Sequence, residues 1–119
     1  MIQIKRAYEE PEKSDGTRIL VDRLWPRGKT KEAMQLAWWA KEISPSNELR
    51  KEFGGMTERF EEFKEAYLAE LDHNSKVGEF VEKVKEAQGK GTVTFVYASK
   101  DLVYNHANVL RELLGENVL

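Results

Sequence analysis

Residues 16–28 read Gly-Thr-Arg-Ile-Leu-Val-Asp-Arg-Leu-Trp-Pro-Arg-Gly, and this stretch predicts a buried strand that runs into a binding loop. The apolar run at 19–21 lies between turn-forming residues and is typical of a core strand, which we expect at about 18–22. The Trp25-Pro26 pair that follows requires an extended or turning backbone. The chain therefore leaves the core at this point and enters a loop.

This loop is cationic. Residues 16–31 contain five Lys or Arg side chains and one carboxylate, whereas the whole chain has a formal net charge of −2. Arg23 and Arg27 suit a phosphate or carboxylate, because each guanidinium can donate two parallel hydrogen bonds. The alternative is that one of them pairs with Asp22 and the other lies in solvent. Arg18, at the start of the strand, is expected to be an ordinary surface charge far from the loop.

Length and composition indicate a single globular domain over residues 1–119, with 40% hydrophobic and 34% charged residues. The chain has no cysteine, which excludes disulfides, thiolate nucleophiles and thiolate metal sites and agrees with a cytoplasmic location. We expect no signal segment, no membrane span and no membrane partner. The near-neutral charge argues against a protein whose main role is to coat nucleic acid.

Strand and helix patterns alternate along the rest of the chain. Alternating apolar residues predict a first strand at 2–6, and the β-branched and aromatic run at 92–98 predicts a central strand. A fragment of a fourth strand is predicted at 117–119. Apolar periodicity and capping residues predict helices at 30–43, 45–53, 57–72, 77–88 and from about 101 to 114. The expected N-terminal caps are Thr30, Ser44, Thr57 and Asp101, and the expected stops are Gly54-Gly55, Gly89 and Gly115.

This order predicts an α/β fold: a small single-domain parallel sheet of three or four strands with Rossmann-like layering, crossover helices and a C-terminal helix. In such sheets ligands bind outside the carboxyl ends of the strands. The ends of the strands at 18–22 and 92–98 should therefore meet at one edge of the sheet. Arg6 and Tyr8, after the first strand, should lie at the same edge.

Three side chains at this edge could act on a proton or orient a substrate. Asp22 could be a general base or orient an arginine, and its cationic neighbours favour the orienting role. His106 could accept or donate a proton near neutral pH, or it could be a packed helix histidine. Asp101 could assist them or simply cap the last helix, and these two roles are compatible.

Other side chains at this edge are candidate ligand contacts. Lys100 could bind a phosphate or be a lone surface lysine, and Asn105 could bind an amide, hydroxyl or phosphate. Trp25 could stack on a ring or only form a wall. With Arg23 and Arg27, these residues predict a pocket for a small anionic ligand.

Neither a metal site nor a bound cofactor is expected. Two separated histidines and no cysteine argue against a metal site, although Asp22 and Asp101 leave a magnesium site as an alternative. The chain has no glycine-rich dinucleotide fingerprint, no phosphate-binding Gly-x-x-x-x-Gly-Lys loop and no Gly-x-Ser-x-Gly elbow. Nicotinamide oxidoreduction, ATP hydrolysis and serine-hydrolase chemistry are therefore disfavoured.

Four segments resemble the domain-of-unknown-function 488 family, also called YeaO-like proteins, and the likeness covers nearly the whole chain. They are 21–28 (Val-Asp-Arg-Leu-Trp-Pro-Arg-Gly), 39–46 (Trp-Ala-Lys-Glu-Ile-Ser-Pro-Ser), 97–101 (Tyr-Ala-Ser-Lys-Asp) and 105–107 (Asn-His-Ala). The resemblance implies a small cytoplasmic α/β domain with no established reaction. Ser44 and Ser99 stand where the family pattern usually or often has alanine, which argues against Ser99 as a nucleophile.

Two functions follow from these expectations. The first is a small hydrolase or transferase acting on a phosphate-bearing or nucleotide-like substrate. The second is a non-catalytic module that senses a small anionic ligand or binds the backbone of nucleic acid, with Lys29 and Lys31 widening the basic patch. The sequence leaves the oligomeric state open.

Overall fold

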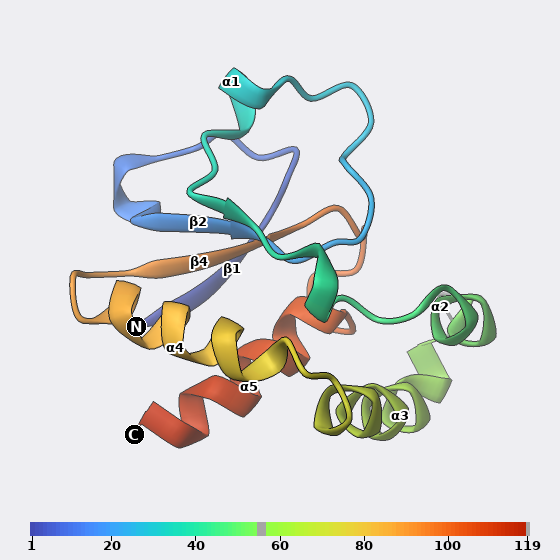
Figure 1. Cartoon of the computed structure of the whole chain (residues 1–119). Coiled ribbons are helices and arrows are strands. Elements are labelled where there is room, and N and C mark those ends of the chain that lie inside the picture. The colour runs from blue at the N-terminus through green and yellow to red at the C-terminus, as the bar shows by residue number, and fades with distance from the viewer. Residues whose placement is uncertain (55–56, 119) are drawn as a thin grey trace.

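The computed structural model describes residues 1–54 and 57–118, and its centre is a sheet of four strands (Figure 1). The strands are parallel and lie in the order β1-β4-β2-β3. The carboxyl ends of β2 and β4 therefore lie at the same edge, as predicted. The strand bounds are β1 Ile2–Arg6, β2 Thr17–Leu20, β3 Trp38–Trp39 and β4 Val93–Tyr97.

Five helices surround the sheet, and none of those described has both the length and the apolar composition needed to cross a bilayer. The last turn of α4 ends at Gly89, as predicted. The helices are α1 (Lys31–Met34), α2 (Asn47–Phe53), α3 (Phe60–Asp72), α4 (Val77–Gln88) and α5 (His106–Val118). Short 3₁₀ turns are η1 (Lys13–Asp15), η2 (Lys41–Ile43) and η3 (Thr57–Arg59).

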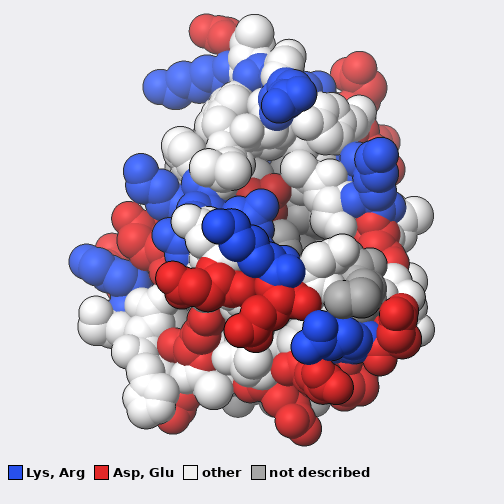
Figure 2. Space-filling model, turned by 90° about the vertical axis from the view of Figure 1, so that its right-hand side faces the viewer, with Lys and Arg blue, Asp and Glu red and all other residues white. Residues whose placement is uncertain are grey.

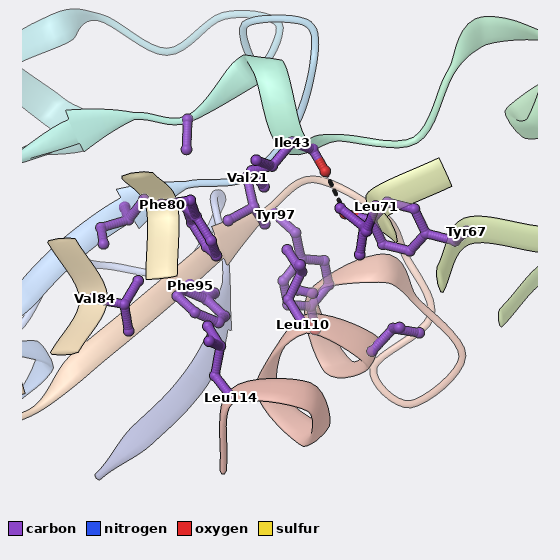
Figure 3. Packing of buried hydrophobic residues seen from close by; sticks show 14 of the residues in the cluster. Val21, Ile43, Tyr67, Leu71, Phe80, Val84, Phe95, Tyr97, Leu110 and Leu114 are labelled. Carbon is purple, nitrogen blue, oxygen red and sulfur yellow. Dashed lines mark hydrogen bonds between the residues drawn. The ribbon is translucent and has the colours of Figure 1, made fainter. Parts of the chain in front are cut away.

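The two faces of the sheet are covered unequally. Helices α4 and α5 pack below it in Figure 1, and Phe80, Phe95 and Leu114 belong to the large core on this side (Figure 3). The other face is covered by the short α1 and by the loop after β2, around a small cluster that includes Leu20 and Met34. Helices α2 and α3 lie beyond the carboxyl ends of the strands.

The predicted helix at 30–43 is wrong in all but its first turn. Thr30 does cap α1, since its hydroxyl oxygen accepts a hydrogen bond from the Ala33 backbone N–H at 3.0 Å. The helix ends at Met34, and the chain then pairs with β2 as the edge strand β3. Hydrogen bonds to β2 and the strand preference of adjacent tryptophans outweigh the helical spacing of the apolar residues.

The caps of the next two helices also differ from prediction. Ser46, not Ser44, caps α2, and its hydroxyl oxygen accepts from the Leu49 N–H at 3.1 Å. The Ser44 hydroxyl instead donates to the Lys41 carbonyl, which closes the preceding 3₁₀ turn. Thr57 begins a 3₁₀ turn, so it does not cap α3 directly. Gly54 ends α2 in the left-handed conformation, as expected, and Gly55 lies outside the described residues.

The C-terminal region has no strand in its described part. Helix α5 continues past the predicted stop at Gly115 as far as Val118, so residues 117 and 118 are helical. Leu119 lies outside the described residues. The fourth strand of the sheet is β3, not the predicted fragment at 117–119.

Candidate functional site

A cavity of about 420 Å³ opens at the carboxyl ends of β2 and β4, where the rules for parallel sheets place a ligand. It brings together segments some eighty positions apart in the sequence, because the loop after β2 and the start of α5 both line it. The lining residues are Tyr8, Asp22, Arg23, Leu24, Trp25, Pro26, Arg27, Ser44, Pro45, Arg50, Phe53, Phe63, Ala98, Ser99, Tyr104, Asn105 and His106. Six of the eight predicted site residues are in this set.

Asp22 connects the ends of three elements at the base of this cavity. Its Oδ2 accepts a hydrogen bond from the Ala98 backbone N–H at 2.9 Å, just after β4. Its backbone carbonyl accepts from Trp39 Nε1 at 2.7 Å, in β3. Its Oδ1 lies 2.7 Å from His106 Nε2, at the first residue of α5. The carboxylate is thus fixed in place, but no hydrogen bond or ion pair of the described residues joins it to an arginine, the group that it was expected to orient.

The side chains of Asp22 and His106 are in close contact. Both side chains are largely buried, with 14% and 16% of their surface exposed. Asp22 Oδ1 and His106 Nε2 are themselves buried, and neither makes a well-formed hydrogen bond within the described part of the chain. The pair therefore joins the loop after β2 to the start of α5 beside the cavity.

Three arginines line the cavity, and two of them, Arg23 and Arg27, were expected there from the sequence. Arg23 donates from Nε to the Pro45 carbonyl at 3.4 Å, which leaves its terminal nitrogens for other partners. Arg27 and Arg50 have no side-chain hydrogen bond or ion pair within residues 1–54 and 57–118. Against these three cations the cavity wall has one carboxylate, Asp22.

Arg50 was missed because its position depends on how α2 docks. Glu70 of α3 accepts hydrogen bonds from the Ser46 backbone N–H at 3.0 Å and from the Ser46 hydroxyl at 2.5 Å. This contact holds the start of α2 against α3. A weak signal was available in the sequence, since no carboxylate lies three or four positions from Arg50 and it has no partner on its own helix.

Trp25 forms part of the cavity wall. Its Nε1 donates to the Lys29 carbonyl at 2.6 Å, which closes the loop on itself. Its ring packs edge-on against Trp39, with centroids 5.4 Å apart. Both tryptophans pack on the small core cluster of the thinly covered sheet face. The loop that presents Arg23 and Arg27 is therefore anchored through Trp25.

Asn105 lines the cavity with its amide groups already in use. Its Oδ1 accepts from the Asn108 N–H at 2.8 Å and so caps α5, while its Nδ2 donates to the Asp101 carbonyl at 2.8 Å. Asp101 accepts from the Tyr104 and Val103 backbone N–H groups at 2.8 and 2.9 Å, and these bonds lower the pKa of its carboxyl. It orders the loop before α5, and Asn105 caps the helix in its place.

Lys100 and Asp101 do not line the cavity. Lys100 is exposed in the loop that follows β4. Arg6 lies at the predicted edge, but its guanidinium donates to the Ser99 and Ala98 carbonyls at 2.9 and 3.1 Å and thereby supports the same loop.

The expectation for Arg18 is wrong, because this side chain is buried. It is 4% exposed and forms an ion pair with Asp15 at 2.7 Å, while its Nε donates to the Met34 carbonyl at 2.9 Å. Lys5 approaches the same carboxylate at 3.1 Å. Arg18 therefore stabilises the opposite end of β2 from the cavity.

Charge is unevenly distributed over the face that carries α2 and α3 (Figure 2). Most acidic side chains visible on this face lie in its lower half, where the helices lie, and a recess lies near its centre. Residues 57–88 contain nine carboxylates and five Lys or Arg side chains, which is typical of a solvated helical face. The cationic loop after β2 lies above them.

Comparison with known proteins finds relatives along the whole chain. "Uncharacterized protein YeaO" of Escherichia coli K12 is 46% identical over 113 residues, covering 95% of this chain and 96% of that protein. "Uncharacterized protein Rv3073c" of Mycobacterium tuberculosis H37Rv is 36% identical over 114 residues, covering 96% and 93%. No solved structure gives a significant match. A family described as "Inactive DUF488-N3 subclade" matches residues 1–119. The chain therefore belongs to the domain-of-unknown-function 488 family, within that subclade.

Proposed function

We propose that the cavity at the carboxyl ends of β2 and β4 binds a small phosphate-bearing ligand without converting it. The observation that carries this proposal is the excess of cations in the wall: three arginines against one carboxylate, which is itself in contact with His106. Guanidinium groups form paired hydrogen bonds with phosphate oxygens, and three of them around one hollow favour a group with several such oxygens.

The state of the arginines supports this proposal. Arg27 and Arg50 make no side-chain hydrogen bond or ion pair with other described residues, and Arg23 uses one nitrogen in a long bond. Structural arginines in this chain look different, since Arg18 is buried against Asp15. Donors that remain available beside a concave surface are the pattern of a ligand site.

Two observations favour binding over turnover. Four hydroxyls line the cavity, and those of Ser44 and Tyr8 already donate to the Lys41 and Arg27 carbonyls. Among the described residues, no hydrogen bond joins the Ser99 or Tyr104 hydroxyl to His106. The family description also uses the word "inactive" for this subclade. Both observations support a module that binds its ligand without turnover. A cavity of this size suits a small ligand better than the backbone of a nucleic acid.

A hydrolase or transferase is the second candidate. The close approach of Asp22 and His106 favours it, because a carboxylate can orient an imidazole that moves a proton. In that case the His106→Gln variant would keep ligand affinity and lose product formation, which phosphorus NMR of an incubated mixture would detect.

Calorimetric titration with inorganic phosphate and with ribose 5-phosphate tests the main proposal. Replacing Arg27 with glutamine should weaken binding by about 10- to 150-fold, because a hydrogen bond to a charged group contributes about 1.5–3 kcal/mol. Lys31→Gln is the matched control, since this exposed cation lies on α1 and does not line the cavity. Equal losses in both variants, or no binding by the unmodified protein, would contradict the proposal.

A further inference from the structure

We propose that the ligand of this cavity is a nucleoside 5′-monophosphate, so that a planar base accompanies the phosphate. This inference rests on the proposed function and extends it, because it concerns the part of the ligand that the arginines do not bind. It is based on the aromatic side chains that line the same cavity as the arginines.

Five aromatic side chains line the cavity: Tyr8, Trp25, Phe53, Phe63 and Tyr104. Phe63 is 5% exposed and stacks on Phe53 with centroids 4.6 Å apart, so this pair also belongs to the core. Tyr8 and Tyr104 are 45% and 44% exposed. Among the described residues these two are the only exposed large aromatic side chains, and both lie at this one cavity.

The polar groups of two of these rings are already bonded within the protein. Trp25 Nε1 donates to the Lys29 carbonyl at 2.6 Å, and the Tyr8 hydroxyl donates to the Arg27 carbonyl at 3.3 Å. The rings therefore offer apolar surface to a ligand and few new hydrogen bonds. Aromatic side chains of this kind stack on any nucleobase, because every base has a flat face.

The size of the cavity fits one nucleotide. A volume of about 420 Å³ lies in the lower part of the range for small-molecule pockets, which is about 300–1,000 Å³. A phosphate held by the arginines would leave the aromatic side chains of the same cavity for the base. The structure thus points to a free mononucleotide. A 5′-phosphorylated oligonucleotide carries the same terminal nucleotide and therefore serves as a separate probe.

Calorimetry at fixed ionic strength with ribose 5-phosphate, adenosine 5′-monophosphate and uridine 5′-monophosphate tests the inference. At least one nucleotide should bind about tenfold or more tightly than ribose 5-phosphate, as expected for one base stacked on an aromatic ring. Tyr104→Leu should remove most of this gain and leave the affinity for ribose 5-phosphate unchanged. Leu102→Ala is the matched control, because Leu102 is 62% exposed in the same loop and does not line the cavity.

Tyr8→Leu gives an independent second variant should Tyr104→Leu fold poorly. Equal affinities for nucleotides and ribose 5-phosphate would overturn the inference and leave the proposed function standing, as would an unchanged ratio in both tyrosine variants. Absence of binding by every phosphate probe would overturn both. Tighter binding of a 5′-phosphorylated oligonucleotide than of either mononucleotide would overturn the assignment to a free nucleotide.

Discussion

Replacing Asp15 with alanine should lower the free energy of unfolding by about 3–5 kcal/mol, because it leaves a buried arginine without its counterion. Asp15 and Arg18 have side chains only 3% and 4% exposed, and their ion pair is 2.7 Å long. Lys5 reaches the same carboxylate at 3.1 Å, and the Glu12 N–H donates to it at 3.0 Å. In urea, such a loss would move the midpoint by about 2 M for a domain of this size.

Equilibrium unfolding in urea, followed by tryptophan fluorescence, measures this change. Glu79→Gln is the control, because Glu79 and Lys83 form an exposed pair at 3.5 Å that should contribute less than about 0.5 kcal/mol. Adding Arg18→Met to Asp15→Ala should recover part of the loss by removing the unpaired charge. A loss below about 1 kcal/mol in Asp15→Ala, or no recovery in the double variant, would refute this reasoning.

Three further outcomes follow from single contacts. Burial alone would raise the pKa of Asp15, but its hydrogen bonds to a backbone N–H and to two cations lower it below the ordinary 3.8. The stability that it adds is therefore present above that value and is lost as pH falls through the lower folded pKa, so urea titrations from pH 5 to 2 should show a steeper decline than in Asp15→Asn. Tyr67→Phe should cost about 1–2 kcal/mol by urea denaturation, since its buried hydroxyl donates to the Ile43 carbonyl at 2.5 Å. Gly16→Ala should cost at least about 2 kcal/mol in the same assay, because Gly16 has φ +64° and a Cβ would collide with the Thr92 carbonyl.

The strands β1 and β4 could be predicted because each one carries its signal in its own residues. The region 30–43 could not, because its apolar spacing fits a helix and only the pairing of Trp38 and Trp39 with β2 decides for a strand. The local helical preference is outweighed there by pairing with a strand that is distant in the sequence, and a short stretch of sequence does not reveal such pairing.

The residues of the candidate site also differ in whether the sequence alone could place them. Asp22 and His106 could be brought together from the sequence, because Asp22 lies just after β2 and His106 begins the helix that follows β4. The carboxyl ends of these parallel strands share one edge of the sheet. Arg50 could not, since it reaches the cavity through the contact of Ser46 with Glu70. The burial of Arg18 could not be predicted, because a charged side chain is buried only where it has a partner of opposite charge. That partner, Asp15, lies in a 3₁₀ turn for which the sequence carries no clear signal.

Under the proposed function, the thin cover on one face of the sheet would link the stability of that face to ligand binding. Among the described residues, no long helix covers Leu20 and Met34, and Trp25 of the cationic loop packs on their cluster instead. A molecule held by Arg23 and Arg27 would tie this loop down and slow the opening of that side of the protein. Amide hydrogen exchange around α1 should therefore report on a ligand that never touches those amides.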